Sequence, residues 1–182
     1  RKGEMLALQW SDIDFENSTV SVTKAAAVVD GKQVCKAPKT KNSRREVSIP
    51  RFLTDRLHNL MVEQTKNKES LGAYWKGNNW LFTQSDGSMM SYSTPYATFQ
   101  DAIDRYNADK EPADQLPHIP FHGLRHTSAT LLIAAHQDVR TVSNRLGHAQ
   151  ASTTMNIYAH ALKENDRTAS NALENMLCKT GA

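Results

Sequence analysis

Hydrophobic and polar positions alternate in three stretches of the first 50 residues, with the period of half-buried β-strands. These stretches are TVSVT at residues 19–23, the segment 28–34, and EVSIP at residues 46–50. Asp30 and Gly31 interrupt the second stretch, and an Asp-Gly pair between apolar runs is typical of a tight β-hairpin. We therefore expect a small antiparallel sheet of about three strands.

Elsewhere the apolar positions recur three and four residues apart, which is the spacing of α-helices. A short helix is expected at residues 2–9, and Pro50 begins a longer one. The apolar face of that longer helix comprises Phe52, Leu53, Leu57, Leu60 and Met61. Further helices are expected at residues 93–108, 122–136, 138–147, about 152–160 and 163–177. The whole pattern predicts an α+β fold that is mainly helical.

The composition is that of an ordinary globular protein. The chain has 182 residues, of which 39% are hydrophobic and 23% are charged, enough for a core without disulfide or metal. No apolar run approaches the roughly 20 residues of a membrane-spanning helix. Cys35 and Cys178 lie far apart and outside any CxxC motif, which indicates reduced thiols in a cytoplasmic protein.

The net charge of +3 is small, but its distribution is uneven. Residues 24–51 carry a local charge of +6, whereas residues 101–119 carry −3. The basic residues of the first segment are Lys24, Lys32, Lys36, Lys39, Lys41, Arg44, Arg45 and Arg51. A concentrated basic strip fits a phosphate backbone, although a solvated lysine-rich hairpin would look the same in the sequence.

The stretch FHGLRHTSATLLIAAH, residues 121–136, is the most informative part of the chain. On a helix, His122, Arg125 and His126 share one face because they are three and four residues apart. The opposite, core-directed face is expected to hold Leu124, Ser128, Leu131 and Ala135. Two histidines four residues apart also occur in zinc hydrolases, but that motif requires glutamate where this chain has Gly123. For His126 itself we expect a local hydrogen bond.

The order of several motifs resembles that of the tyrosine recombinases, and within them the catalytic domain of phage-type integrases. The motifs are RKGE at Arg1 to Glu4, Lys39-Thr40 before a strand, HGLRHT at 122–127, LGH at 146–148 and IYAH at 157–160. The resemblance extends over roughly residues 1–165 and implies the fold of that catalytic domain with its small antiparallel sheet. It also implies that residues 1–182 belong to a longer protein whose DNA-binding segments precede them.

The resemblance implies a phosphate-binding role for three residues and a structural role for a fourth. Arg1 and Arg125 would clamp the non-bridging oxygens of the scissile phosphate, and His148 would donate a hydrogen bond to it. Glu4 would be structural and would orient the arginine or its helix. The chemistry requires such groups, because a pentacoordinate phosphorane carries extra negative charge that planar guanidinium groups can bind bidentately.

Three further residues would act on protons and covalent bonds. Tyr158 would be the nucleophile that forms a 3′-phosphotyrosyl link to DNA, Lys39 would protonate the departing 5′-oxygen, and His122 would be the general acid–base. Tyrosine has an ordinary pKa near 10, so a base and nearby cations must favour its phenolate. Lys41 is close enough in the sequence to rival Lys39 as the acid.

The resemblance also implies the partners. Duplex DNA attachment sites would be the substrate, with DNA contacts from Lys36, Lys41, Arg44 and Arg45, and no metal or other cofactor is required. The full-length protein would act as a homotetramer on DNA, with accessory DNA-bending or excision factors as further partners. Two alternatives stay open at this point: topoisomerase-like nicking and rejoining of the type IB kind, and a non-catalytic DNA-binding module.

Overall fold

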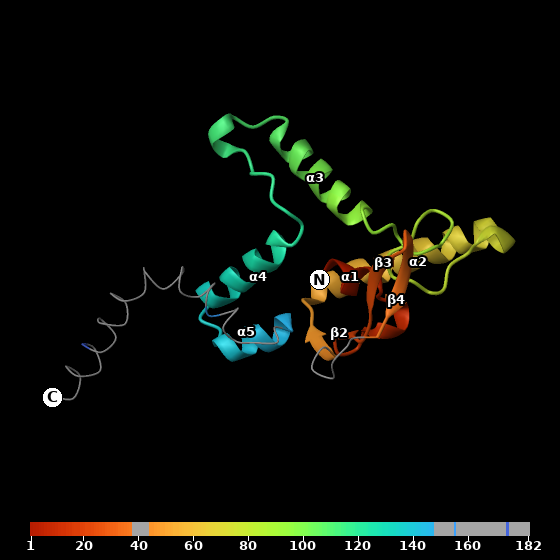
Figure 1. Ribbon diagram of the computed structural model, residues 1–182, viewed down its shortest axis with the longest axis horizontal. Helices are drawn as coiled ribbons and strands as arrows, with labels where there is room; N and C mark the ends of the chain where they lie inside the picture. Colours follow the sequence, from red (N-terminus) through yellow and green to blue (C-terminus); the bar gives the residue numbers. More distant parts are fainter. Residues whose placement is uncertain (38–43, 148–154, 156–173, 175–182) are drawn as a thin grey trace. The chain divides into compact units, whose positions relative to one another are not determined.

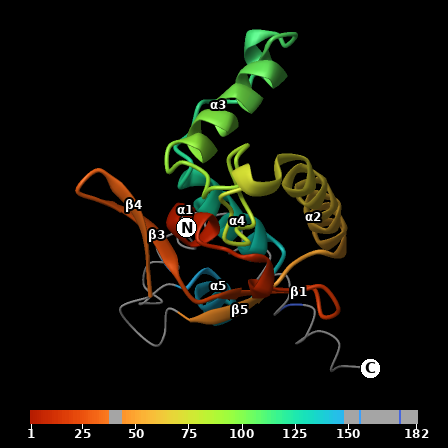
Figure 2. The same ribbon diagram turned by 90° about the vertical axis from the view of Figure 1, so that its right-hand side faces the viewer.

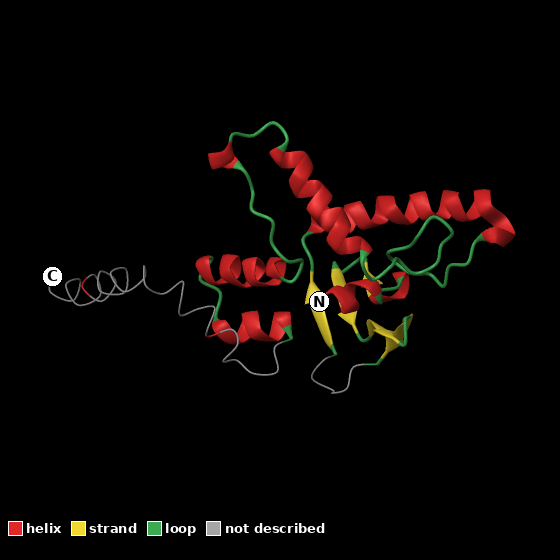
Figure 3. Cartoon of the chain, turned by 45° about the horizontal axis from the view of Figure 1, so that its top comes forward, coloured by secondary structure: helices red, strands yellow, loops and turns green. Residues whose placement is uncertain are grey.

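The computed structural model describes residues 1–37, 44–147, 155 and 174 (Figure 1). The chain divides into two compact units, Arg1–Gly123 and Leu124–Ala182, and each is described by itself. Helices make up about half of the described chain and strands a much smaller part of it (Figure 3). The predicted mainly helical α+β fold is therefore confirmed. None of the helices in the described ranges is long and apolar enough to cross a bilayer.

A three-stranded antiparallel sheet forms one half of the first unit's β-structure. Its strands are β1 (Ile13–Asp14), β2 (Thr19–Val22) and β5 (Arg45–Ser48), in the order β1-β2-β5. In the register, Val20 lies opposite Val47 and Val22 lies opposite Arg45. The central strand therefore receives its second partner from a segment that follows it by more than twenty residues, and that partner begins with an arginine.

The predicted hairpin is present but does not join that sheet. Strands β3 (Ala25–Val29) and β4 (Lys32–Lys36) pair only with each other, and Figure 2 shows them as a two-stranded ribbon beside α1. Asp30 and Gly31 have φ values of 48° and 73°, the left-handed conformations that a two-residue hairpin turn requires. The prediction of a small three-stranded antiparallel sheet is confirmed, but the hairpin is not part of that sheet, because the tight turn pairs β3 with β4 while β2 pairs with β1 and β5.

Among its described residues, the first unit also contains three helices and three short 3₁₀ turns. Helix α1 spans Lys2–Leu6, α2 spans Arg51–Leu71 and α3 spans Thr94–Asn107, close to the predicted positions. The 3₁₀ turns are Trp10–Asp12, Gly72–Tyr74 and Pro112–Asp114.

Helix α2 packs on the three-stranded sheet through only part of the predicted face. Leu57 is buried in a core with Ile13, Val20 and Leu81, and Leu60 packs against that core, whereas Phe52 is 69% exposed and Leu53 is 38% exposed. The side chain of Gln64 accepts a hydrogen bond from the Trp10 indole at 2.9 Å and donates one to the Leu81 carbonyl oxygen at 2.9 Å. The sheet and the segment around Leu81 thus select which side of the helix is buried.

Helix α1 packs closely on the hairpin. Leu6, Ala7 and Ala26 are buried together, and a Cβ atom added to Gly3 would lie 2.4 Å from the backbone oxygen of Ala26. No real Cβ makes so short a contact with backbone, so glycine at this position lets the helix approach strand β3.

The second unit, in its described part, consists of α4 (Gly123–Ala134) and α5 (Val139–Leu146). Ala129, Ile133, Val142 and Leu146 form its buried core, with Leu132 packed against it. The predicted core face of α4 was wrong, since Leu124 is 38% exposed and Leu131 is 64% exposed, and Ser128 and Ala135 are also exposed. Contact with α5 determines which face of α4 is buried. The sequence pattern alone does not identify that face, because apolar residues occur on more than one side of α4.

The close approach at Gly3 generates a stability prediction. Gly3→Ala should destabilise the chain by about 1–3 kcal/mol, the usual cost of overpacking, because the obstructing atom is backbone and α1 must move away from β3. Gly123→Ala is the matched control, since its added Cβ would meet only the Ile119 side chain at 3.4 Å or more. Urea unfolding followed by circular dichroism measures both variants, and equal stability of Gly3→Ala and wild type would contradict the packing argument.

Candidate functional site

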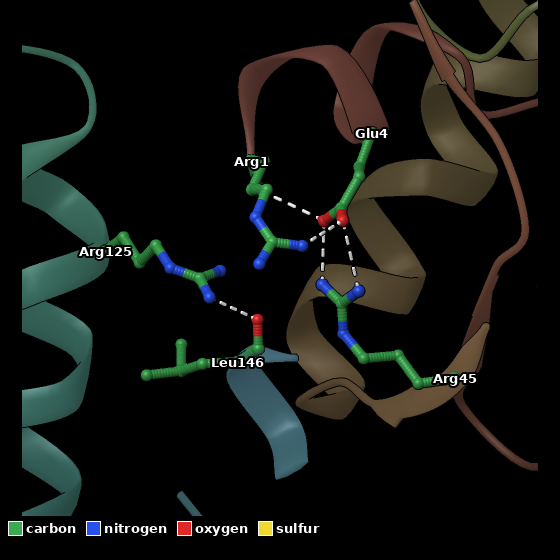
Figure 4. Close-up of polar contacts among 5 residues, drawn as sticks. All are labelled: Arg1, Glu4, Arg45, Arg125 and Leu146. Carbon is green, nitrogen blue, oxygen red and sulfur yellow. Dashed lines mark hydrogen bonds and ion pairs between the residues drawn. The ribbon is translucent and has the colours of Figure 1, made fainter. Parts of the chain in front are cut away.

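A glutamate carboxylate in the first unit binds two arginine side chains, one from α1 and one from β5. Arg1 donates from Nη1 to Glu4 Oε1 at 2.8 Å. Arg45 donates to both carboxylate oxygens, from Nη1 to Oε1 at 3.2 Å and from Nη2 to Oε2 at 2.7 Å. Figure 4 shows the Glu4 carboxylate between the two guanidinium groups. The contact that the resemblance implies between Glu4 and Arg1 is thus present.

The local sequence explains how these groups meet. Arg1 is the N-cap of α1 and Glu4 lies one helical turn later, so their side chains point from the same side of a short helix. Arg45 is the first residue of β5 and pairs with Val22 of β2. Helix α1 and strand β5 are therefore joined by an ion pair between residues 41 positions apart.

The pKa of Glu4 is low, so its carboxyl group is ionised at neutral pH. Burial by itself raises the pKa of a carboxyl group, but the hydrogen bonds from Arg45 and Arg1, aided by the α-amino group, outweigh it and lower the pKa of Glu4 to about 2. The side chains of Glu4 and Arg45 are 10% and 13% exposed, while that of Arg1 is 41% exposed. The cluster of Arg1, Glu4 and Arg45, which we call the arginine–glutamate cluster, therefore has a buried side and an accessible side.

A depression of about 300 Å³ adjoins this cluster and is lined by Arg1, Glu4, Lys24 and Tyr92 among others. Lys24 donates to Gln9 Oε1 at 2.7 Å and pairs with Asp12 at 2.8 Å, so the first cation of the basic segment is neutralised within the fold. The ammonium group of Lys2 lies 4.0 Å from the centre of the Tyr92 ring. The accessible guanidinium of Arg1 thus lies at the edge of a concave surface.

Arg125 is held in a different way in the second unit. It projects from α4 and donates from Nη2 to the backbone carbonyl oxygen of Leu146, the last residue of α5 (Figure 4). Helix α5 ends at Gly147, whose φ of 65° is left-handed, as the sequence predicts for a glycine that terminates a helix. At its other end the Asp138 side chain caps α5 by accepting a hydrogen bond from the Thr141 backbone at 2.9 Å.

The remaining predicted site residues fall into two groups. His122 is exposed and lies in the turn just before α4, not within the helix, while Lys36 at the end of β4 and Arg44 just before β5 are also exposed. The neighbouring Phe121 ring packs on Phe99 with centroids 6.0 Å apart. Lys39, Lys41, His148 and Tyr158 lie outside the described residues. Within the described ranges, no three histidine, cysteine or acidic side chains gather as a metal site would require.

The sequence analysis missed the pairing of Arg45 with Glu4. It grouped Arg45 with the DNA contacts because of its basic neighbours, whereas the structure places its guanidinium against a buried carboxylate. No short-range signal marks this pairing, since the spacing between the two residues follows neither a helix nor a hairpin. Only the unusual burial of Glu4, at 8% exposure, shows that this carboxylate needs charged partners.

The low pKa of Glu4 generates a prediction about acid stability. A folded-state pKa of about 2 against 4.5 in the unfolded chain means that ionised Glu4 stabilises the fold above pH 4.5 and that this contribution disappears as the pH falls towards 2. The expected contribution at pH 7 is about 3 kcal/mol. Glu4→Gln should therefore lower the free energy of unfolding strongly at pH 7. The difference in free energy of unfolding between wild type and Glu4→Gln should be smaller at pH 3.

Urea unfolding at both pH values tests this, with Glu69→Gln as the control on the exposed surface of α2. If wild type and Glu4→Gln differ in free energy of unfolding by the same amount at pH 7 and pH 3, Glu4 stabilises the fold by something other than its charge.

Comparison with known proteins agrees with this geometry. Residues 1–165 match the model of the phage integrase family. The chain is 31% identical over 188 aligned positions to a tyrosine recombinase XerC-like protein of Caldanaerobacter subterraneus subsp. tengcongensis, covering 97% of this chain and 46% of that protein. It is 33% identical over 179 positions to the ICEBs1 integrase of Bacillus subtilis, again covering 97% of this chain and 46% of the relative. The chain thus spans about half the length of these curated relatives.

A solved structure shares the fold. The integrase of transposon Tn1549, in complex with transposon right end DNA, superposes with a TM-score of 0.78 at 24% identity, over 96% of this chain and 55% of that one. The predicted fold of a recombinase catalytic domain is thereby confirmed. The family match extends over residues 1–165 and includes both Arg1 and Arg125, and the chain accordingly belongs to the phage integrase family of tyrosine recombinases.

Proposed function

We propose that this chain catalyses site-specific DNA recombination, the integration or excision of a phage or other mobile element, through a covalent 3′-phosphotyrosyl intermediate. The observation that carries the proposal is the anchoring of the two predicted phosphate-binding arginines. Glu4 holds Arg1 and the Leu146 carbonyl holds Arg125, in a chain that belongs to a family of recombinases. A guanidinium fixed by a second protein group is preorganised to neutralise charge.

The proposed reaction is a transesterification at one DNA phosphate. The Tyr158 oxygen attacks phosphorus and forms a P–O bond, its proton passes to His122, and the bond from phosphorus to the 5′-oxygen breaks. Lys39 gives a proton to that departing oxygen, leaving a free 5′-hydroxyl. Attack by the 5′-hydroxyl of a partner strand reverses these steps. The phosphotyrosyl ester conserves the bond energy, so no external energy source takes part.

The arginines act on the charge that develops during this exchange. Arg1 and Arg125 donate to the non-bridging oxygens of the phosphorane, and His148 adds a further hydrogen bond. Each donor is worth more in the transition state than in the ground state because negative charge accumulates there. The 41% exposure of the Arg1 side chain leaves it accessible to a phosphate while Glu4 fixes its orientation.

Duplex DNA attachment sites are the proposed partner, bound in the full protein by a homotetramer together with DNA-bending or excision factors in the cytoplasm. Lys36 and Arg44, which lie on either side of residues 38–43 in the basic segment, are exposed. Both suit contacts with phosphate, as does Lys41 from its sequence position. Such contacts make affinity fall as salt rises, because each neutralised phosphate releases counterions. No metal or other cofactor enters the proposed chemistry.

A covalent-capture experiment tests the nucleophile. The full gene product that contains these residues is incubated with a pool of nicked duplexes of randomised sequence, and adducts that survive detergent are recovered and sequenced. We expect adducts enriched in one sequence, and Tyr158→Phe should abolish them because phenylalanine has no nucleophilic oxygen. Adducts on all sequences alike would favour topoisomerase-like nicking, and binding without any adduct would favour a non-catalytic module.

Arg125 provides a second test. Arg125→Ala should lower the rate constant of single-turnover cleavage at saturating DNA by about 100-fold or more, since one preorganised donor to the transition state is lost. Arg140→Ala, at an exposed position of α5 in the same unit, is the control and should cleave at the wild-type rate. A normal cleavage rate in a folded Arg125→Ala variant would remove Arg125 from the proposed mechanism.

A further inference from the structure

The arginine–glutamate cluster is asymmetric. Arg45 engages both oxygens of Glu4, and its side chain is only 13% exposed. The guanidinium of Arg1 engages one oxygen through Nη1, and the Arg1 side chain is 41% exposed. Of the two arginine side chains, that of Arg45 is therefore the more buried, and that of Arg1 is the more accessible to a ligand.

The supports of the two arginines also differ. Arg45 belongs to β5, which is paired along its length with β2. Arg1 precedes helix α1, whose buried residue Leu6 packs on Ala26 of β3. The position of α1 depends on its packing against β3 and on the bond from Glu4 to Arg45. The sheet thus supplies a fixed point to which the helix is attached.

The charges favour the same interpretation. Glu4 carries one negative charge between two positive groups, so Arg45 is already paired with a carboxylate at 2.7 Å. To bind a phosphate through Nη1 and Nη2, Arg45 would have to give up both of its bonds to Glu4, and the loss of these donors to a buried carboxylate is costly. The bidentate fork also fixes the plane of the Glu4 carboxylate, and with it the direction in which Oε1 accepts from Arg1.

We infer that Arg45 is a positioning residue for the reaction: it holds the Glu4 carboxylate, which in turn orients the Arg1 guanidinium toward the scissile phosphate. This inference rests on the proposed function and assigns Arg45 to transition-state stabilisation through Arg1, not to DNA affinity. Arg45→Gln then lowers the rate of cleavage and leaves DNA affinity nearly unchanged. Arg45→Lys keeps the charge but loses the fork, so its rate is intermediate.

Single-turnover cleavage of the captured DNA sequence, in a nicked duplex with the full gene product, separates these effects. For Arg45→Gln we expect the rate constant at saturating DNA to fall roughly 10- to 100-fold, the usual effect of a displaced catalytic group, with the dissociation constant of the DNA almost unchanged. Glu4→Gln should have the same effect, and the double variant should be no slower than either single one. Arg56→Gln, an exposed arginine of α2, is the matched control with wild-type rate and affinity.

A chemically altered substrate provides a readout that general loss of structure would not change. In a duplex with sulfur as the 5′-bridging atom, the leaving group is a thiolate, whose conjugate acid has a pKa near 8.5 in a cysteine side chain and needs no proton donor. This substrate should restore cleavage by Lys39→Ala but not by Arg45→Gln, because Arg1 acts on the non-bridging oxygens.

Restored cleavage of the sulfur substrate by Arg45→Gln would overturn the inference and assign Arg45 to the leaving-group step. Weakened DNA binding with a normal rate constant would also overturn it and make Arg45 a DNA contact. Circular dichroism confirms that each variant is folded at the assay temperature. If the wild-type protein forms no adduct at all, the proposed function itself fails, which is a different result from a fully active Arg45→Gln variant.

Discussion

The ion pairs that Glu4 makes with Arg1 and Arg45 are the interactions on which the described part of the candidate site depends. Burying one carboxylate is unfavourable unless charged partners replace its water, and here two guanidinium groups do so. The low pKa of Glu4 shows that these partners outweigh the cost of burial. Because one partner comes from α1 and the other from β5, satisfying this charge also fixes the helix relative to the sheet.

Arg125 illustrates a second way to hold a guanidinium. Its acceptor is the carbonyl of Leu146 at the end of α5, and the last carbonyl groups of a helix have no partner within the helix itself. These groups also carry the negative end of the helix dipole, so a cation placed there is stabilised. The same bond joins α4 to the turn at Gly147, after which the chain continues to His148. One arginine is therefore oriented by a carboxylate and the other by backbone.

The close contact of Gly3 with Ala26 allows α1 to lie where Glu4 can reach Arg45. The arginine–glutamate cluster requires α1 to lie near the strands, and a side chain at position 3 would keep it away. Glycine in the interior of a short helix lowers its intrinsic stability, and packing of Leu6 and Ala7 against Ala26 compensates. The glycine of the RKGE motif thus has a packing role beside the charged roles of its neighbours.

Several turns and helix ends of this protein could be predicted from the local sequence. Three local features follow from residues close together in the chain, where backbone preferences act directly: the Asp30-Gly31 turn, the start of α2 after Pro50 and the end of α5 at Gly147. The tertiary structure decided the buried faces of α2 and α4, the separation of the hairpin from the three-stranded sheet, and the bond from Arg45 to Glu4. Each of these depends on which distant surface a segment contacts. Glu4 and Arg45 are 41 positions apart, and no periodic signal in the sequence links them. The physical reason is that conformational preference acts over a few residues, whereas the burial of apolar faces and the pairing of charges are settled when the whole chain packs.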